Sequence, residues 1–231
     1  MTHRSHTYLY ILSICISSLL MLKPSPMLAQ DAVPAAPLRG DTTAFFRGFS
    51  VMTDLVGPAQ LAFGDYGQWE VGARLNIKDK YFPIVELGIG KADADDPATH
   101  LTYKTSAPYG RIGIDFNLMR NKHDDYRLYG GMRYAYTKYQ FDLFCPGVED
   151  PVWRESADFR ADDVDCYYHW LEFAFGIDAK IWGPVRMGWS ARYKRRLFHD
   201  DGFVGRSWYV PGYGKQGNAR LGGTFNVIIE F

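Results

Sequence analysis

Two histidines with acidic neighbours come closest to a hydrolytic pattern. His169 lies three residues before Glu172, and His199 is followed directly by two aspartates. A histidine base beside a nucleophile and an orienting acid is the arrangement that nucleophilic hydrolysis requires. However, Ser207 is the only serine in the segment from residue 195 to residue 217. A His-Asp-Asp run is more typical of a solvated turn. We therefore predict no catalytic residues and keep enzymatic activity as an alternative.

Carboxylates offer a second chemistry, the binding of a hard divalent cation. Residues 142–165 carry eight acids against two arginines, and Asp93, Asp95 and Asp96 form a further acidic cluster. Ca²⁺ and Mg²⁺ prefer oxygen ligands, but no spacing in these segments matches a dedicated calcium loop. The pattern favours a solvated acidic face. We predict no metal site and no cofactor.

A further set of charged residues lies in eight segments in which apolar and polar residues alternate: 49–55, 68–77, 81–90, 110–118, 128–137, 170–179, 185–194 and 218–231. Such alternation is typical of strands with two different faces. Every charge in these segments lies on one parity, opposite the apolar residues. Opposite charges crowded into a narrow interior should pair, because an unpaired buried charge is far costlier. The expected ion-pair network comprises Glu70, Arg74, Glu86, Arg111, Asp115, Arg133, Glu172, Asp178, Arg186, Arg192, Arg220 and Glu230.

The connections between these segments indicate how the strands are assembled. Short connections at 78–80, 119–125 and 180–184 alternate with longer ones at 56–67, 91–108, 142–168 and 195–217. An even number of strands with this alternation is typical of a membrane barrel, whereas a soluble sandwich has no reason to order its loops in this way. We predict an all-β fold, an eight-stranded antiparallel up-and-down transmembrane β-barrel spanning residues 46–231.

Composition agrees with this class and excludes others. The 231 residues include 26 basic and 26 acidic side chains, so the formal net charge is zero and a nucleic-acid partner is not indicated. Aromatic residues make up 16% of the chain, and there are 23 glycines. Aromatic side chains suit pleated surfaces and glycine suits tight turns and closely packed barrel walls. Both features favour an all-β chain.

The amino terminus has the pattern of an export signal. A weakly basic start precedes an apolar run from Tyr8 to Leu22, and small residues near position 29 offer a cleavage site. We predict a signal peptide over residues 1–30 and a flexible leader over 31–45, which is rich in proline and alanine. A short membrane anchor is the alternative interpretation of the apolar run.

Cleavage would leave two cysteines, Cys145 and Cys166. In an exported protein, an even pair within one segment favours a disulfide. Two unpaired buried thiols are the alternative.

The final segment alternates in the same way and ends on an aromatic residue, Phe231. In this respect it resembles the closing strand of bacterial outer-membrane barrels, and residues 46–231 resemble the small OmpA/OmpX-type barrels. The stretches 54–58 and 76–88 are similar to an exported Bacteroidota-type barrel family of unknown function. The resemblance implies residence in the outer membrane of a Gram-negative bacterium, with both termini in the periplasm. It also implies contact with outer-membrane lipid and lipopolysaccharide, and recognition of Phe231 by the barrel assembly machinery.

An eight-stranded barrel is just wide enough inside for side chains to fill it. We therefore expect a plugged polar lumen and a structural or interaction role through the extracellular loops, with an extracellular partner left unidentified. Aromatic residues at 203, 208, 209 and 213 either bind such a partner or fold back over the barrel mouth. The alternatives are a narrow pore for ions or small solutes, and an enzyme that modifies lipid or lipopolysaccharide.

Overall fold

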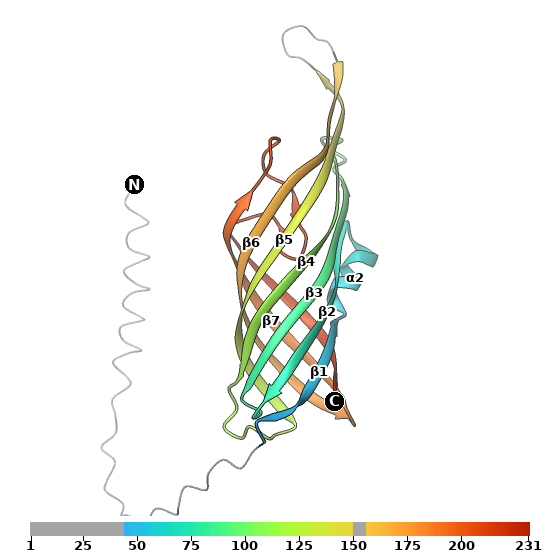
Figure 1. Cartoon of the computed structure of the whole chain (residues 1–231). Coiled ribbons are helices and arrows are strands. Elements are labelled where there is room, and N and C mark those ends of the chain that lie inside the picture. Colours follow the sequence, from blue (N-terminus) through green and yellow to red (C-terminus); the bar gives the residue numbers. More distant parts are fainter. Residues whose placement is uncertain (1–43, 150–155) are drawn as a thin grey trace, which may run out of the picture. The chain divides into compact units, whose positions relative to one another are not determined.

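The computed structural model describes residues 44–149 and 156–231, and within them eight long antiparallel strands close into a barrel (Figure 1). The order around the wall is β1-β10-β7-β6-β5-β4-β3-β2, so each strand pairs with its neighbour in sequence and β10 pairs with β1. The predicted all-β, up-and-down barrel is confirmed. The predicted signal peptide and almost all of the predicted leader lie outside the described residues. The wall strands are β1 (Phe46–Asp54), β2 (Tyr66–Ile77), β3 (Tyr81–Asp95), β4 (Thr102–Asn117), β5 (Tyr126–Glu149), β6 (Ser156–Trp182), β7 (Val185–Asp200) and β10 (Ala219–Glu230).

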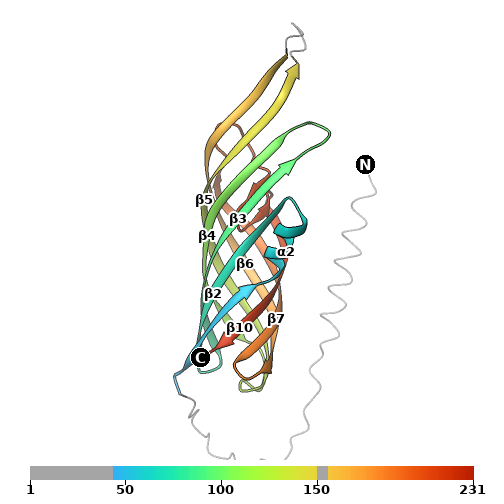
Figure 2. The same cartoon turned by 90° about the vertical axis from the view of Figure 1, so that its right-hand side faces the viewer.

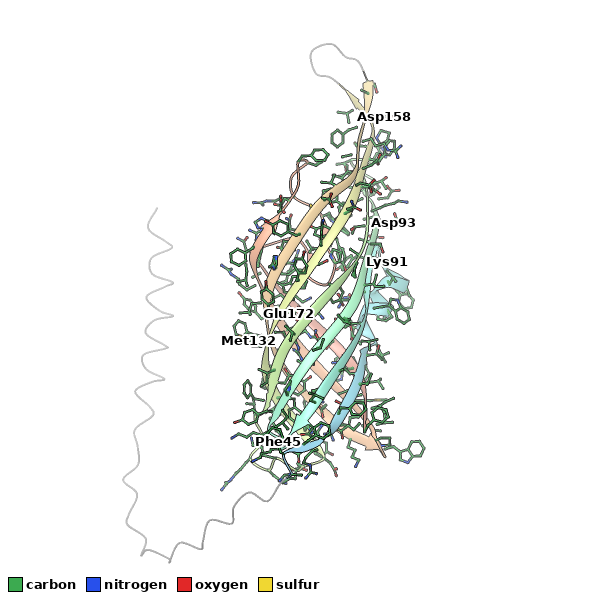
Figure 3. All side chains as sticks on the ribbon, viewed as in Figure 1. Phe45, Lys91, Asp93, Met132, Asp158 and Glu172 are labelled. Carbon is green, nitrogen blue, oxygen red and sulfur yellow. The ribbon has the colours of Figure 1, made fainter. Side chains whose placement is uncertain are left out.

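The short turns and both ends of the barrel chain lie together. Lys78, in the β2–β3 turn, donates its amide to the Phe45 carbonyl, and the Glu230 amide donates to Pro184 in the β6–β7 turn. Phe45 is labelled at this end in Figure 3. At the opposite end, β5 and β6 extend beyond the other strands as a long hairpin (Figures 1 and 2).

The β3–β4 and β5–β6 connections differ from the sequence prediction. Residues 91–108 and 142–168 were expected to be loops, but most of them continue the strands, with Asp93 paired to Lys104 and Leu143 paired to Ala161. These hairpins keep their ladder hydrogen bonds past the rim of the barrel. The two ends of the barrel therefore differ in the length of their strands as much as in the length of their loops.

The polarity of the wall inverts along the strands. Over most of the barrel the outward side chains are apolar, including Val85, Ile112 and Met132, the last of which is labelled on the outer wall in Figure 3. Towards the long-hairpin end the outward side chains become polar, as at Lys91 and Lys104, and the inward ones become aromatic or apolar. The buried inward cluster there comprises Ala92, Tyr103, Ala107, Tyr109, Ala135, Tyr139, Phe141, Ala161, Val164, Cys166, Tyr168, Trp170, Tyr209, Val210 and Tyr213.

A short helix, α2 (Val56–Phe63), follows β1 where the sequence predicted only a loop. The Asp54 carboxylate accepts hydrogen bonds from the amides of Val56 (3.1 Å), Gly57 (2.9 Å) and Phe225 (3.0 Å). It therefore stops the β1–β10 ladder and begins the helix at the same point. No helix in the described residues is long and apolar enough to cross a membrane.

The predicted disulfide is wrong, because Cys145 and Cys166 are both free. Cys166 pairs with Tyr139, which lies six residues before Cys145 on β5, whereas Cys145 pairs with Phe159. At roughly 3.3 Å per residue the two cysteines are about 20 Å apart along the ladder, and a disulfide needs Cα atoms within about 7 Å. The hairpin is held by its backbone ladder instead.

We expect the two thiols to differ in reactivity. Cys145 is partly exposed and Cys166 is buried in the inward cluster, so a maleimide should label Cys145 in the folded protein and Cys166 only after unfolding. Peptide mapping by mass spectrometry would identify the labelled residue. A shift in gel mobility on reduction, with neither thiol labelled in the unreduced protein, would contradict the free-thiol assignment.

Candidate functional site

The centre of the barrel contains a cluster of carboxylates and guanidinium groups contributed by six strands. Glu86 on β3 is its hub: Arg192 of β7 donates from two nitrogens to its two oxygens, each at 3.0 Å. Arg111 of β4 and Arg133 of β5 each lie 3.3 Å from the same carboxylate. All of these side chains are almost fully buried. Inward parity on neighbouring strands brings them together, because each strand directs every second side chain into the lumen.

Two further glutamates complete the cluster. Glu70 accepts hydrogen bonds from Arg111, from the Tyr109 hydroxyl at 2.7 Å and from Arg192 at 3.2 Å. Glu172, labelled in Figure 3, lies 2.9 Å from Arg111 Nε and accepts from Trp170 Nε1 at 2.6 Å. Three acids thus share three arginines, and all six side chains are almost fully buried. Removing any one charge would leave its partners buried and uncompensated.

A second group of ion pairs lies nearer the short-turn end. Asp178 binds Arg74 at 3.0 Å and Arg186 at 2.7 Å. The Arg74 guanidinium also stands over the rings of Phe82 and Tyr129, 5.2 and 5.5 Å from their centroids. Such cation–π contacts add to the attraction within a desolvated site. Asp115 belongs to the central cluster, where it pairs with Arg133 at 2.9 Å.

Two members of this system, Arg127 and Lys194, are not in the predicted network, and one predicted member, Arg220, lies elsewhere. Arg127 pairs with Glu230 at the end of the lumen. It precedes the predicted fifth strand by one residue and has the inward parity, a signal that a longer strand would have captured. Arg220 is placed near the mouth, where its Nε donates to the Lys215 carbonyl at 2.7 Å. No acid pairs with it in the described residues.

A loop between β7 and β10 is folded into the barrel mouth above the central cluster. It contains the two short strands β8 (Tyr209–Val210) and β9 (Gly214–Lys215), which pair with each other. The Gly212 carbonyl at its turn accepts hydrogen bonds from Arg111 (2.8 Å) and Lys194 (2.6 Å). We call residues 209–213 the plug.

Further hydrogen bonds and close packing fix the plug in place. Tyr103 donates to the Tyr209 carbonyl at 2.7 Å, and Tyr209 donates to the Gly67 carbonyl at 3.1 Å. Gly212 has a φ of +80°, and a Cβ there would lie 2.5 Å from the Tyr109 ring. Only glycine fits this turn, since it needs both a left-handed backbone and contact with an aromatic face. Of the aromatic residues in this loop, Phe203 is the one that stays open to solvent, at 82% exposure.

A family model for a domain of unknown function, DUF6048, matches residues 7–231, nearly the whole chain. The chain belongs to the DUF6048 family. No curated protein sequence matches it. Among solved structures, Neisserial surface protein A is similar over 80% of this chain and 99% of its own, with 13% identity and a TM-score of 0.42. A major outer membrane protein from Thermus thermophilus covers the same shares, with 11% identity and a TM-score of 0.44. The attachment invasion locus protein of Yersinia pestis covers 80% of this chain and 98% of its own, with 10% identity and a TM-score of 0.40.

The histidines considered for hydrolysis are not assembled into one site in this DUF6048 barrel. His169 faces outward, where its Nδ1 lies 2.6 Å from the Tyr134 hydroxyl, while Glu172 faces the lumen. His199 lies 3.3 Å from Asp201, and Ser207 is bonded to the Tyr139 hydroxyl at 2.6 Å. In the described residues, no group of three or more potential metal ligands is assembled.

A smaller polar cluster closes the short-turn end of this DUF6048 barrel. Asp79, in the β2–β3 turn, accepts a hydrogen bond from Asn76 at 2.6 Å, lies 2.7 Å from His123 Nδ1, and pairs with Arg47 at 3.1 Å. Burial disfavours the charged form, but the hydrogen bonds from Asn76 and His123 and the charge of Arg47 outweigh it. The pKa of Asp79 is therefore lowered. The carboxylate remains ionised and ties the start of β1 to two turns.

Proposed function

We propose that this protein is an integral barrel of the bacterial outer membrane whose lumen is closed to solutes. It acts through the structure that it presents outside the membrane. The observation that carries the proposal is the plug, which is bonded directly to Arg111 and Lys194 of the lumen. A barrel meant to conduct would leave this mouth free. Here backbone carbonyls of the loop take part in the polar network that fills the interior.

The inversion of polarity supports the membrane location. Outward apolar side chains over the lower wall, such as Leu87, Trp189 and Phe175, would be costly in water but suit lipid. Outward polar side chains with an apolar interior, as at the long hairpins, suit water. The same strands have apolar outward side chains in one part and polar outward side chains in the next. This change fits a bilayer surface at the level where the polarity inverts.

The β5–β6 hairpin supports a role outside the membrane. It extends beyond the rest of the barrel (Figure 1), and its Asp142, Asp158 and Asp162 are solvent-exposed. Asp158 is labelled in Figure 3. A negatively charged projection of this kind repels like-charged surfaces and favours partners with basic surfaces. We infer a structural or interaction role, with lipopolysaccharide and outer-membrane lipid as the immediate surroundings.

We expect the purified wild-type barrel to be electrically silent in planar lipid bilayers. The ion-pair clusters and the plug occupy the lumen at successive levels, so we expect them to interrupt any water path across it. The measurement is single-channel current, with insertion verified by heat-modifiable gel migration and a general porin reconstituted in parallel as a positive control. Discrete current steps above background would favour the narrow-pore alternative and sink the closed-lumen proposal.

A further inference from the structure

The barrel wall has a gap on one side, between β2 and β10. β1 pairs with β10 only from Ser50–Glu230 to Asp54–Asn226, so β10 from Ala219 to Thr224 has no partner on that side. Residues 66–69 of β2 likewise extend past the end of β1. Helix α2 occupies the space that β1 leaves (Figure 2).

The helix covers one edge of this gap and leaves the other open. A Cβ on Gly57 would lie 2.4 Å from the Gln68 carbonyl, and one on Gly67 would lie 2.5 Å from the Leu61 amide, so α2 packs backbone to backbone on β2. On the β10 side lies a cavity of about 150 Å³. It is lined by Gln60 of α2, by residues 221–224 of β10 and by five basic side chains. We call it the lateral pocket.

The basic residues of the lateral pocket are Arg111, Arg192, Lys194, Lys215 and Arg220, and no acid lines it. The first three are nearly fully buried and balance the glutamates beneath them. Lys215 and Arg220 have no acidic partner within the described parts of the chain and add uncompensated positive charge. An uncompensated positive charge of this kind attracts an anion, which the Lys215 ammonium and the Arg220 guanidinium can bind through charge-assisted hydrogen bonds.

We propose that the lateral pocket binds a phosphomonoester group, held by Lys215 and Arg220 at its rim and by the buried arginines at its base. Gly222 faces the cavity, where an added Cβ would meet Lys194 at 3.7 Å, so the strand leaves room for the group. Outside, Leu221 is 82% exposed and Phe63 of α2 is 93% exposed, which provides apolar surface beside a charged pocket. This combination fits the phosphorylated headgroup of a lipid entering from the side. The lipid source rests on the proposed membrane location, whereas free phosphate would share the same chemistry.

The test is native mass spectrometry of the full chain in detergent micelles containing dioleoyl phosphatidic acid, with dioleoyl phosphatidylcholine as the comparison lipid. We expect selective retention of phosphatidic acid. The double variant Lys215→Gln/Arg220→Gln should weaken retention about tenfold or more, since it removes two charge-assisted contacts. The matched control Lys104→Gln/Lys138→Gln removes two exposed rim charges outside the pocket and should retain lipid like the wild type. Equal retention by both double variants would overturn the proposal.

A second pair of variants tests the cavity without changing any charge. Gly222→Leu should fill the lateral pocket and abolish selective retention, whereas Gly110→Leu, where an added Cβ would meet only Leu87 at 3.5 Å, should not.

Competition with inorganic phosphate assigns the source: displacement of the lipid at millimolar phosphate supports a free anion as ligand, and no displacement supports the headgroup. Wild-type retention by Gly222→Leu would refute the pocket as the site. None of these substitutions removes a plug residue or a side chain that donates a hydrogen bond to the plug, so a conducting barrel that still selects phosphatidic acid would refute only the closed lumen.

Discussion

Replacing Arg192 by methionine is expected to lower the free energy of unfolding of the barrel by about 3–5 kcal/mol. Arg192 bonds both oxygens of Glu86 at 3.0 Å and lies 3.2 Å from Glu70. Methionine fills much of the same space but carries no charge. The buried carboxylates of Glu86 and Glu70 then lose one of their cationic partners. The free-energy cost of their desolvation is no longer offset by ion pairing. The loss of compensation, more than the loss of packing, determines the size of the effect.

The measurement is urea unfolding in detergent micelles, followed by heat-modifiable gel migration. The matched control is Arg195→Met, three residues further along β7, where the side chain is exposed and has no ion pair in the described residues. It should unfold like the wild type. The double variant Arg192→Met/Glu86→Gln removes both partners and should recover part of the stability. If the double variant were less stable than Arg192→Met, packing and not charge compensation would explain the loss.

The parity of the charged residues predicted which side chains face the lumen, and the alternation of short and long connections favoured a barrel over a sandwich. Glu86, Arg111 and Glu172 lie at inward positions of separate strands, and closure of the sheet brings them within ion-pair distance. Parity fixes which face a side chain is on but not its height along the barrel. For this reason the sequence could not place Arg220 at the mouth or show that Asp178 pairs with Arg74 in a separate group.

The extent of the strands was harder to predict because the rule changes partway along them. In the lower barrel most inward residues are polar, whereas towards the long-hairpin end the inward residues are mostly aromatic or apolar, as at Tyr139 and Phe141. The alternation of outward apolar and inward polar residues ends at this inversion. The remaining strand residues therefore resemble loops in the sequence. The same error produced the disulfide, since a supposed loop over 142–168 could bend to join Cys145 to Cys166 and a paired hairpin cannot.

Helix α2 and the plug depend on contacts that no local pattern encodes. α2 is only eight residues long, contains a proline, and begins where Asp54 bonds amides of its own segment and of Phe225 in β10. The plug depends on Gly212 lying against Tyr109 and on donors from β4 and β7. The sequence showed aromatic residues among glycines in this loop. It could not choose between an exposed surface and a folded-back one.

Deleting Phe231 is expected to destabilise barrel closure by roughly 2–4 kcal/mol, the sum of two backbone hydrogen bonds and an aromatic pair. Its amide donates to the Phe49 carbonyl at 2.8 Å, the Phe49 amide donates to its carbonyl at 3.2 Å, and the two rings stack 5.0 Å apart. Gly48 accommodates this approach, with a φ of +122° and a hypothetical Cβ only 2.1 Å from the Phe231 carbonyl oxygen. Phe231 therefore forms the last hydrogen-bonded pair between β1 and β10.

Phe231→Ala separates closure from the proposed assembly signal. It keeps both backbone hydrogen bonds, so refolding into detergent micelles should remain close to that of the wild type. If the assembly machinery reads the aromatic end, the variant will still be depleted from the outer-membrane fraction of cells, and Phe231→Tyr will accumulate normally. Deletion of Phe231 should impair both refolding in micelles and accumulation in the outer membrane, because it removes the β1–β10 hydrogen bonds as well as the aromatic end. Normal outer-membrane levels of Phe231→Ala, alongside poor levels of the deletion, would assign Phe231 to closure alone.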